Sequence, residues 1–163
     1  MDVIIWSSSL EIGVKAIDAE HKHLIEFIHL VRAASEKQRS TLNSNKKFLN
    51  DLKILFMAHF EKEEDLMFQI GYPGVNAHMI LHSAMQGDFD TRILETEQTG
   101  DVECALSFVA TWIIDHMATA DTSLAGFIQQ KRDAKAQARA KRAETVPKTA
   151  RELAHAIAAK ARR

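Results

Sequence analysis

Apolar residues recur at intervals of three and four positions in four separate segments of the chain, a spacing typical of one face of an amphipathic α-helix. The inward-facing series of these segments are Ile17, His21, Leu24, Ile28 and Val31; Phe48, Leu52, Leu55, His59, Glu63 and Leu66; Val75, His78, His82, Met85, Phe89 and Ile93; and Val102, Leu106, Val109, Ile113 and His116. The pattern therefore predicts four helices, each of which buries one stripe.

Turn residues separate the predicted helices. Residues 71–74 (Gly-Tyr-Pro-Gly) end the second helix and start the third, because glycine closes a helix and proline fits a first helical turn. Residues 99–101 do the same before the fourth helix, with Asp101 as its N-cap. Residues 39–44 form a polar turn between the first two helices. Residues 1–17 carry apolar side chains without helical period, so we expect an ordered N-terminal arm laid across the bundle.

Composition supports an all-α fold. The chain has 163 residues, which fits one domain with a sizeable core, and its six glycines and two prolines leave little material for many turns. We find no apolar run of membrane length and no basic, apolar leader, so neither membrane insertion nor export is expected. The single cysteine, Cys104, excludes an internal disulfide and is expected to pack near the start of the fourth helix. A cytoplasmic location follows as an expectation.

Charge is distributed unevenly along the chain. Residues 131–163 hold 11 Lys and Arg against 3 Asp and Glu, a balance of +8, whereas residues 1–130 hold 10 against 19, a balance of −9. We therefore expect residues 1–130 to form the helical domain and residues 131–163 to form a basic, partly helical C-terminal extension.

The basic extension admits three interpretations. It is a solvated helix that aids solubility, or an arm that folds onto its own acidic domain or another copy, or a segment that meets nucleic acid or an acidic membrane surface. No aromatic residue interleaves its basic residues, which disfavours nucleic acid. An acidic partner of the extension therefore stays open.

Titratable residues occupy the predicted core stripes. Residues four apart on a helix lie one turn above one another, so His59 and Glu63 can reach one point. His78 and His82 form a second pair of this kind. Burying such groups without partners would cost roughly several kcal/mol each, whereas a metal ion satisfies imidazole and carboxylate directly. The sequence therefore predicts a metal site in the core.

One further carboxylate fits the site less directly. Asp121 lies five residues beyond His116, which is about 140° around an ideal helix. It reaches the site if it approaches from the edge of the stripe, or if a π-bulge widens the helix locally. Spacing alone does not favour it over Asp115.

Four short motifs surround these residues. They are Ile-Asp-Ala-Glu-His-Lys at 17–22, His-Phe-Glu-Lys-Glu-Glu-Asp-Leu-Met at 59–67, Tyr-Pro at 72–73 before His-Met-Ile-Leu-His at 78–82, and Trp-Ile-Ile-Asp-His at 112–116 leading to Asp121. Together they resemble the motifs of the hemerythrins, in particular the bacterial hemerythrins, over residues 1–130. All seven motif positions are filled, by His21, His59, Glu63, His78, His82, His116 and Asp121.

The resemblance implies two non-haem iron ions, joined as an oxo-bridged di-iron centre, inside an up-down-up-down four-helix bundle. By the same resemblance, His78, His82 and His116 would hold one iron, His21 and His59 the other, and Glu63 and Asp121 would bridge both. Dioxygen would bind at the iron with fewer ligands. Spacing does not choose the metal, because imidazole and carboxylate also suit zinc or manganese.

The function implied by the resemblance is reversible dioxygen binding, for storage, delivery or sensing, without enzymatic turnover. The alternative is a di-iron enzyme acting on nitric oxide or peroxide, or an iron–sulfur repair factor, since the same seven ligands would serve. No chemistry is assigned to His23, His29 or His155, which lie off the ligand pattern. Glu64 points away from Glu63 on the helix and is expected to be solvated.

Overall fold

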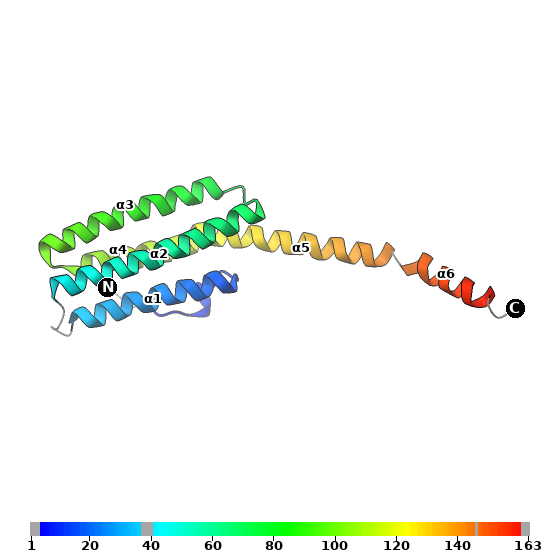
Figure 1. Cartoon of the computed structure of the whole chain (residues 1–163), viewed down its shortest axis with the longest axis horizontal. Helices are drawn as coiled ribbons and strands as arrows, with labels where there is room; N and C mark the ends of the chain where they lie inside the picture. The colour runs from blue at the N-terminus through cyan, green and yellow to red at the C-terminus, as the bar shows by residue number, and fades with distance from the viewer. Residues whose placement is uncertain (1–3, 37–40, 146, 161–163) are drawn as a thin grey trace. The chain divides into compact units, whose positions relative to one another are not determined.

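The computed structural model describes residues 4–36, 41–145 and 147–160 (Figure 1). Helices are the only regular elements in these ranges: the 3₁₀ turn η1 Ser8–Leu10, α1 Lys15–Glu36, α2 Leu42–Ile70, α3 Val75–Thr99, α4 Val102–His116, the π-helical turn η2 Met117–Asp121, α5 Thr122–Thr145 and α6 Pro147–Lys160. The chain divides into two compact units, Met1–Ala125 and Gly126–Arg163.

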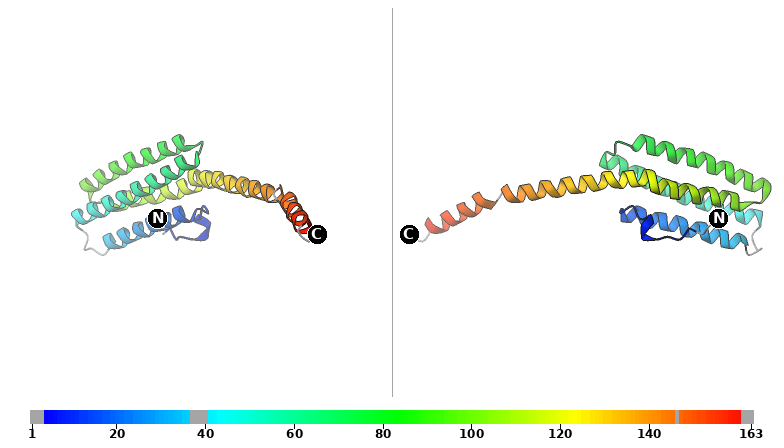
Figure 2. Two further views of the ribbon diagram at one scale, coloured as in Figure 1. Left: turned by 45° about the vertical axis from the view of Figure 1, so that its right-hand side comes forward. Right: turned by 180° about the vertical axis from the view of Figure 1, so that it is seen from behind.

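The first unit contains an up-down-up-down four-helix bundle (Figure 1). Helix α1 packs against α2, α2 against α3 and α3 against α4, and α4 closes the ring against α1. Short turns at residues 71–74 and 100–101 join α2 to α3 and α3 to α4, which makes these consecutive helices antiparallel. The same order of helices is seen from the two directions of Figure 2. The predicted all-α bundle is confirmed.

The ends of the helices follow the turn residues of the sequence. Gly71 and Gly100 adopt left-handed φ angles of 63° and 77°, which glycine tolerates because it has no Cβ, and they end α2 and α3. The Asp101 carboxylate accepts hydrogen bonds from the backbone N–H groups of Glu103 and Cys104, so it caps α4 as predicted. Cys104 itself is exposed, and the prediction that it packs near this end was wrong.

Aromatic rings from three helices meet at the centre of the core. Phe56 of α2 lies 5.8 Å from Phe60 and 6.3 Å from Phe89 of α3, measured between ring centroids. Its ring is also 6.3 Å from that of Trp112 on α4. Phe56 and Phe89 are completely buried. Phe56 therefore contacts α3, which is next to α2 in the ring, and also α4, which lies diagonally across the bundle from α2.

The buried stripe of α2 differs from the predicted one. At three of the predicted inward positions, 48, 55 and 66, the structure buries the next residue instead, namely Leu49, Phe56 and Met67. Phe48 and Leu55 are half-buried and pack at the margin of the core. Neighbouring residues lie about 100° apart on a helix, so the broad apolar face of α2 admits either stripe, and the fit against the neighbouring helices decides between them.

The N-terminal segment packs against the bundle, as expected. The side chains of Ile4, Trp6 and Leu10 are half-buried and pack against the core. The Ile4 carbonyl oxygen lies 2.5 Å from the His29 Nε2 atom of α1, and the Ile12 N–H donates to Asp18 at 2.8 Å. These two polar contacts anchor the segment to α1, which gives His29 a structural role.

The second unit holds the rest of α5 and all of α6, and these helices bury very little. Ile128 is 9% exposed, but every residue from Gln129 to Lys160 whose burial is described is exposed. In the part of the chain that the structure describes, no helix is both long and apolar enough to span a bilayer.

Replacing Phe56 by Ala should destabilise the bundle by about 3–5 kcal/mol, because a completely buried ring is lost where three helices meet. The free energy of unfolding of the metal-free protein, obtained from urea denaturation, measures the change. Phe68→Ala is the matched control on the same helix, since Phe68 is 58% exposed, and should cost less than about 1 kcal/mol. Equal losses in the two variants would contradict the assigned core.

Candidate metal centre

Seven titratable side chains gather inside the bundle, and none is more than 4% exposed. They are His21 of α1, His59 and Glu63 of α2, His78 and His82 of α3, His116 of α4 and Asp121 of η2. The structure thus brings together every residue that the sequence indicated for the site. Their donor atoms form two groups that share Asp121.

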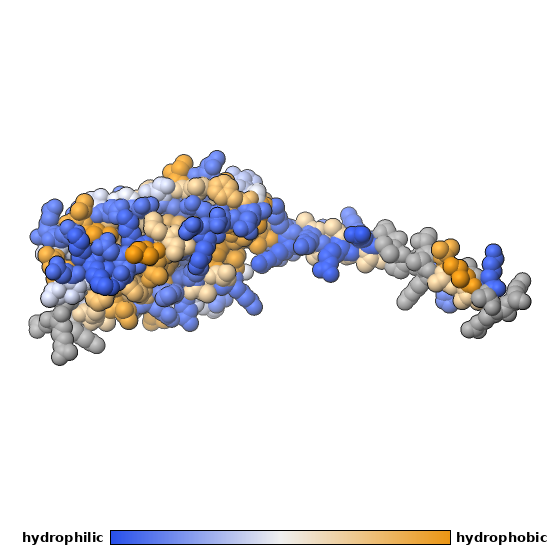
Figure 3. Space-filling view, viewed as in Figure 1, coloured by the Kyte–Doolittle hydropathy of each residue, from blue (hydrophilic) through white to orange (hydrophobic). Residues whose placement is uncertain are grey.

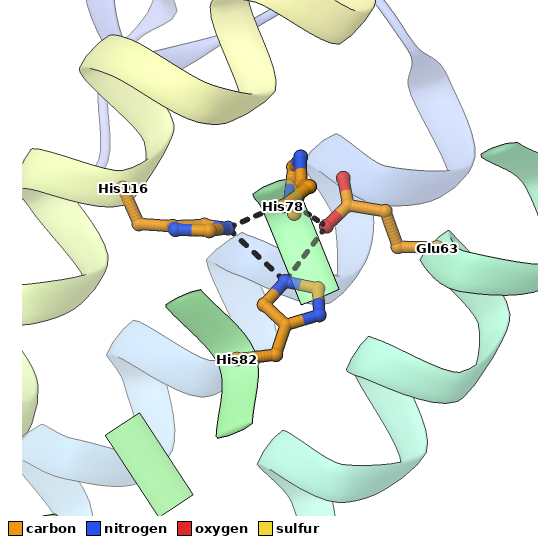
Figure 4. Close-up of side chains that lie close together, drawn as sticks. All are labelled: Glu63, His78, His82 and His116. Atoms are coloured by element: carbon orange, nitrogen blue, oxygen red, sulfur yellow. Dashed lines mark hydrogen bonds and ion pairs between the residues drawn. The ribbon is translucent and has the colours of Figure 1, made fainter. Parts of the chain in front are cut away.

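Three histidines and Glu63 form the first group, and their side chains converge in Figure 4. The Nε2 atom of His116 lies 2.9 Å from that of His78 and 3.1 Å from that of His82. Glu63 Oε2 is 3.2 Å from His78 Nε2 and 3.4 Å from His82 Nε2. Asp121 Oδ1 joins this group, at 3.1 Å from His116 Nε2 and 3.3 Å from His78 Nε2.

Two histidines form the second group. The Nε2 atoms of His21 and His59 are 3.2 Å apart, and Asp121 Oδ2 lies 3.2 Å from His21 Nε2. Asp121 therefore offers one oxygen to each group. Glu63 lies closer to the first group than to the second. Its Oε2 atom is 4.0 Å from His59 Nε2 but 3.2 Å from His78 Nε2.

A π-helical turn explains how Asp121 reaches the site. In η2 the backbone N–H of Thr122 donates to the Met117 carbonyl, five residues earlier. A π-helical turn holds more residues than an α-helical turn, so five residues bring the chain back to about the same face. Asp121 therefore lies on the face of His116 rather than about 140° away. Of the two routes considered from the sequence, the structure shows the π-bulge. Asp115, the competing carboxylate, is exposed.

Both buried carboxylates are held in the charged form. Burial by itself raises the pKa of Glu63, but contacts with His78 and His82 outweigh it and hold the pKa at about 2. Burial likewise opposes the charge of Asp121, yet the imidazoles around it hold its pKa far below the usual range. Against the effect of burial, Asp121 and Glu63 raise the pKa of His78 to about 9, whereas burial lowers the pKa of His116.

The carboxylates of the site have no hydrogen-bond partner, whereas the imidazole Nε2 atoms lie within hydrogen-bond distance of one another. Both oxygens of Glu63, both oxygens of Asp121 and the Nδ1 atom of His21 are buried without a hydrogen-bond partner. The carboxylate oxygens thus lie close to imidazole nitrogens without hydrogen-bond geometry. Adjacent ligands of an octahedral metal with bonds of about 2.1 Å are about 3.0 Å apart. The 2.9–3.4 Å separations in the first group are close to this value, so its residues fit a metal ion.

Two outer carboxylates contact the far side of two of these imidazoles. Glu64 Oε1 lies 2.8 Å from His82 Nδ1, and Glu20 Oε2 lies 3.1 Å from His59 Nδ1. The other oxygen of Glu20 pairs with Lys62 at 2.5 Å. Although burial opposes it, contact with His59 and Lys62 lowers the pKa of Glu20. Because an ionised carboxylate only accepts, each imidazole donates its Nδ1–H and leaves the Nε2 lone pair directed into the site.

The expectation that Glu64 is solvated was wrong. Glu64 lies about 100° from Glu63 around α2, and this rotation aims it at His82 of the adjacent helix instead of at solvent. Sequence reasoning missed Glu20 and Glu64 because neither falls on a core stripe. A signal was present, however, since each is the immediate neighbour of a residue on the ligand pattern and therefore borders the buried face.

Stacked aromatic rings fix the planes of two imidazoles. Phe60 stacks on His82 with a centroid distance of 3.8 Å and an interplanar angle of 9°. Trp112 stacks on His116 at 4.3 Å and 17°. These flat contacts restrict ring rotation about χ2 and shield the first group from water. Phe60 and Trp112 thus line the site as well as the core.

Comparison with known proteins identifies the family. The model of the hemerythrin HHE cation binding domain matches residues 12–128, and the chain belongs to the hemerythrin family. Hemerythrins are oxygen-binding proteins with a non-haem di-iron centre.

Relatives of the chain include bacteriohemerythrins and a hemerythrin subunit. It is 28% identical to a bacteriohemerythrin of Stenotrophomonas maltophilia over 127 residues, which cover 77% of this chain and 81% of that protein. A bacteriohemerythrin of Clostridium acetobutylicum is 26% identical, with coverage of 73% and 96%. Hemerythrin subunit 1 of Golfingia vulgaris is 29% identical, with coverage of 78% and 95%.

The contact between Glu64 and His82 yields a prediction for metal affinity. Glu64→Gln should weaken metal binding by roughly 10–100-fold, because the amide no longer fixes the His82 ring and its proton as a carboxylate does. Competition between the protein and a coloured chelator for ferrous iron measures the affinity. Glu61→Gln removes an exposed carboxylate one turn away on the same helix and should leave it unchanged. Identical affinities of the two variants would show that Glu64 has no positioning role.

Proposed function

We propose that this protein binds dioxygen reversibly, for storage, delivery or sensing, at a di-iron centre held by the seven buried side chains. The position of Asp121 carries the proposal. Its two oxygens lie 3.1 Å from His116 Nε2 and 3.2 Å from His21 Nε2, so one carboxylate faces both groups of imidazoles. Such a carboxylate suits a bridge between two cations.

The proposed roles follow the two groups of donors. One iron is assigned to His78, His82 and His116, the other to His21 and His59, and the bridges to Glu63 and Asp121. The second group has one histidine fewer, so we assign the space beside His21 and His59 to dioxygen. A bound di-iron centre would supply the electrons for oxygen binding, and the protein supplies the donor atoms and the buried surroundings.

A cavity beside the second group supports this assignment. It has a volume of about 70 Å³ and is lined on one side by apolar residues and on the other by polar ones, namely Leu24, Leu55 and Ala58, and His23, His59, Glu20 and Lys62. A space of this size accommodates a diatomic molecule, and its apolar wall suits an uncharged gas. We propose it as the approach of dioxygen to the centre.

The composition of the donor set favours binding over oxidation. Five of the seven donors are imidazoles, whereas the ferritin-like di-iron proteins use glutamates for most of their ligands. Buried aromatic and aliphatic side chains around the site exclude water and thereby limit loss of electrons to solvent. We therefore propose a carrier or sensor in preference to an enzyme.

The first prediction for this function is a stoichiometry of two iron ions per chain. Reconstitution with ferrous iron without air, followed by exposure to oxygen, should produce charge-transfer absorption that disappears when oxygen is removed. Iron analysis and visible spectra of the same samples give both quantities.

One ion per chain after full reconstitution would refute a paired centre. Catalytic consumption of nitric oxide or peroxide, with product formed over many cycles, would instead favour a di-iron enzyme. Zinc that fully supports the oxygen response would refute iron as the functional metal.

The second prediction concerns the bridging carboxylate. Asp121→Ala should reduce the iron content from two ions to about one or fewer and lower the melting temperature of the metal-loaded protein, because binding energy of the metal contributes to folding. Asp115→Ala, at an exposed aspartate six residues earlier in α4, should retain both ions. Two tightly bound ions in the Asp121 variant would show that the bridge is misassigned.

A further inference from the structure

Basic side chains form a stripe along α5. Five of its six Lys and Arg residues fall within an arc of about 100° around the helix, and its acidic Asp133 lies on the opposite side. The residues of this stripe are Lys131, Arg132, Lys135, Arg139 and Arg142, all exposed. A stripe of this kind presents positive charge in one direction, which suits an extended anionic surface.

Helix α6 adds an apolar pair. Leu153 and Ile157 lie one turn apart on the same face and are 65% and 63% exposed. Glu152 and His155 lie on the other side of the helix, which is therefore amphipathic. Figure 3 shows this apolar patch on α6, in contrast to the hydrophilic stretch of α5.

A lysine stands at the end of the same apolar face. Lys160 follows Ile157 by three positions and is exposed. The aliphatic stem of a lysine lies along an apolar layer while its ammonium group reaches the polar boundary above it. This face of α6 thus carries two apolar side chains, Leu153 and Ile157, and a positive charge, that of Lys160.

We propose that α5 and α6 dock on the surface of an anionic lipid bilayer. The basic stripe of α5 would contact the lipid phosphates, while Leu153 and Ile157 would enter the boundary between headgroups and acyl chains. The helices lie on the surface and do not cross the bilayer. With two large apolar side chains, the contact is reversible and depends on salt.

Two other anionic partners fit these observations less well. Nucleic acid would use the basic stripe but not the apolar pair, and residues 131–163 contain no Phe, Trp or Tyr to stack on bases. The acidic bundle, of this copy or another, already pairs many of its acids with Lys or Arg: Glu20, Glu26, Asp51, Asp90, Glu95, Glu97 and Glu103 have such partners. A lipid surface uses both the charge and the apolar pair.

The experiment is sedimentation of the full-length protein with vesicles. One set contains phosphatidylcholine alone, and the other contains phosphatidylcholine and phosphatidylglycerol in equal parts, each at low and high salt. We expect binding to the mixed vesicles alone, with loss of binding at high salt. Absence of binding to the mixed vesicles at low salt would overturn the proposal.

Variants test the two parts of the surface separately. Leu153→Ala with Ile157→Ala should weaken vesicle binding by roughly tenfold, and Lys135→Gln with Arg139→Gln by a similar factor. Controls on the bundle, Ile54→Ala with Leu94→Ala and Lys22→Gln with Lys47→Gln, remove two exposed apolar side chains and two exposed positive charges, and should bind as the unaltered protein does.

Three results would contradict the proposal. Full binding by the Leu153 and Ile157 variant would mean that the apolar pair takes no part. Tighter, salt-dependent binding to double-stranded DNA than to vesicles, insensitive to the apolar pair, would indicate nucleic acid. Self-association at low salt, abolished by the Lys135 and Arg139 variant while vesicles fail to bind, would indicate a second copy.

Discussion

The burial of charge in an apolar bundle is the constraint on which the rest of the structure depends. Glu63 and Asp121 lie in the core as anions, and neither finds a hydrogen-bond partner among its neighbours. An arrangement of this kind is costly unless cations stabilise it, so the folded state and the metal-bound state are coupled. The four helices meet where their donor atoms converge, and the apolar side chains fill the space around that point.

Much of this arrangement could be predicted from the sequence because stripes and ligands share the helical period. His21, His78 and His116 occupy apolar stripes, so one pattern gave both the packing faces and the titratable residues on them. In α2 the pattern failed by one position, at Leu49, Phe56 and Met67 of the true stripe. An apolar face that is wide leaves the rotation of a helix undecided, and only the shapes of neighbouring helices settle it.

Two acidic residues, Glu64 and Asp121, have positions that the period of their own helix does not predict. Glu64 looked solvated because its own helix gave it no partner, while the partner, His82, belongs to the adjacent helix. Spacing alone could not choose Asp121 over Asp115, although the family resemblance did, because the choice rests on a hydrogen bond between Thr122 and Met117 that no periodicity contains. Helical periodicity cannot locate either feature, since the first depends on a neighbouring helix and the second on a local change of helix type.

The π-helical turn also shifts the buried register between α4 and the first residues of α5. Before it, the buried register ends at His116; after it, a new register begins with Asp121 and Leu124, both completely buried, one residue later than the old register would place them. The buried face of α4 and the buried face at the start of α5 therefore follow two different registers around the helix axis. Substitutions on either side of the turn need only keep the helical period of their own side. Gain or loss of a single residue within the turn would rotate the buried face of the residues that follow it away from the bundle.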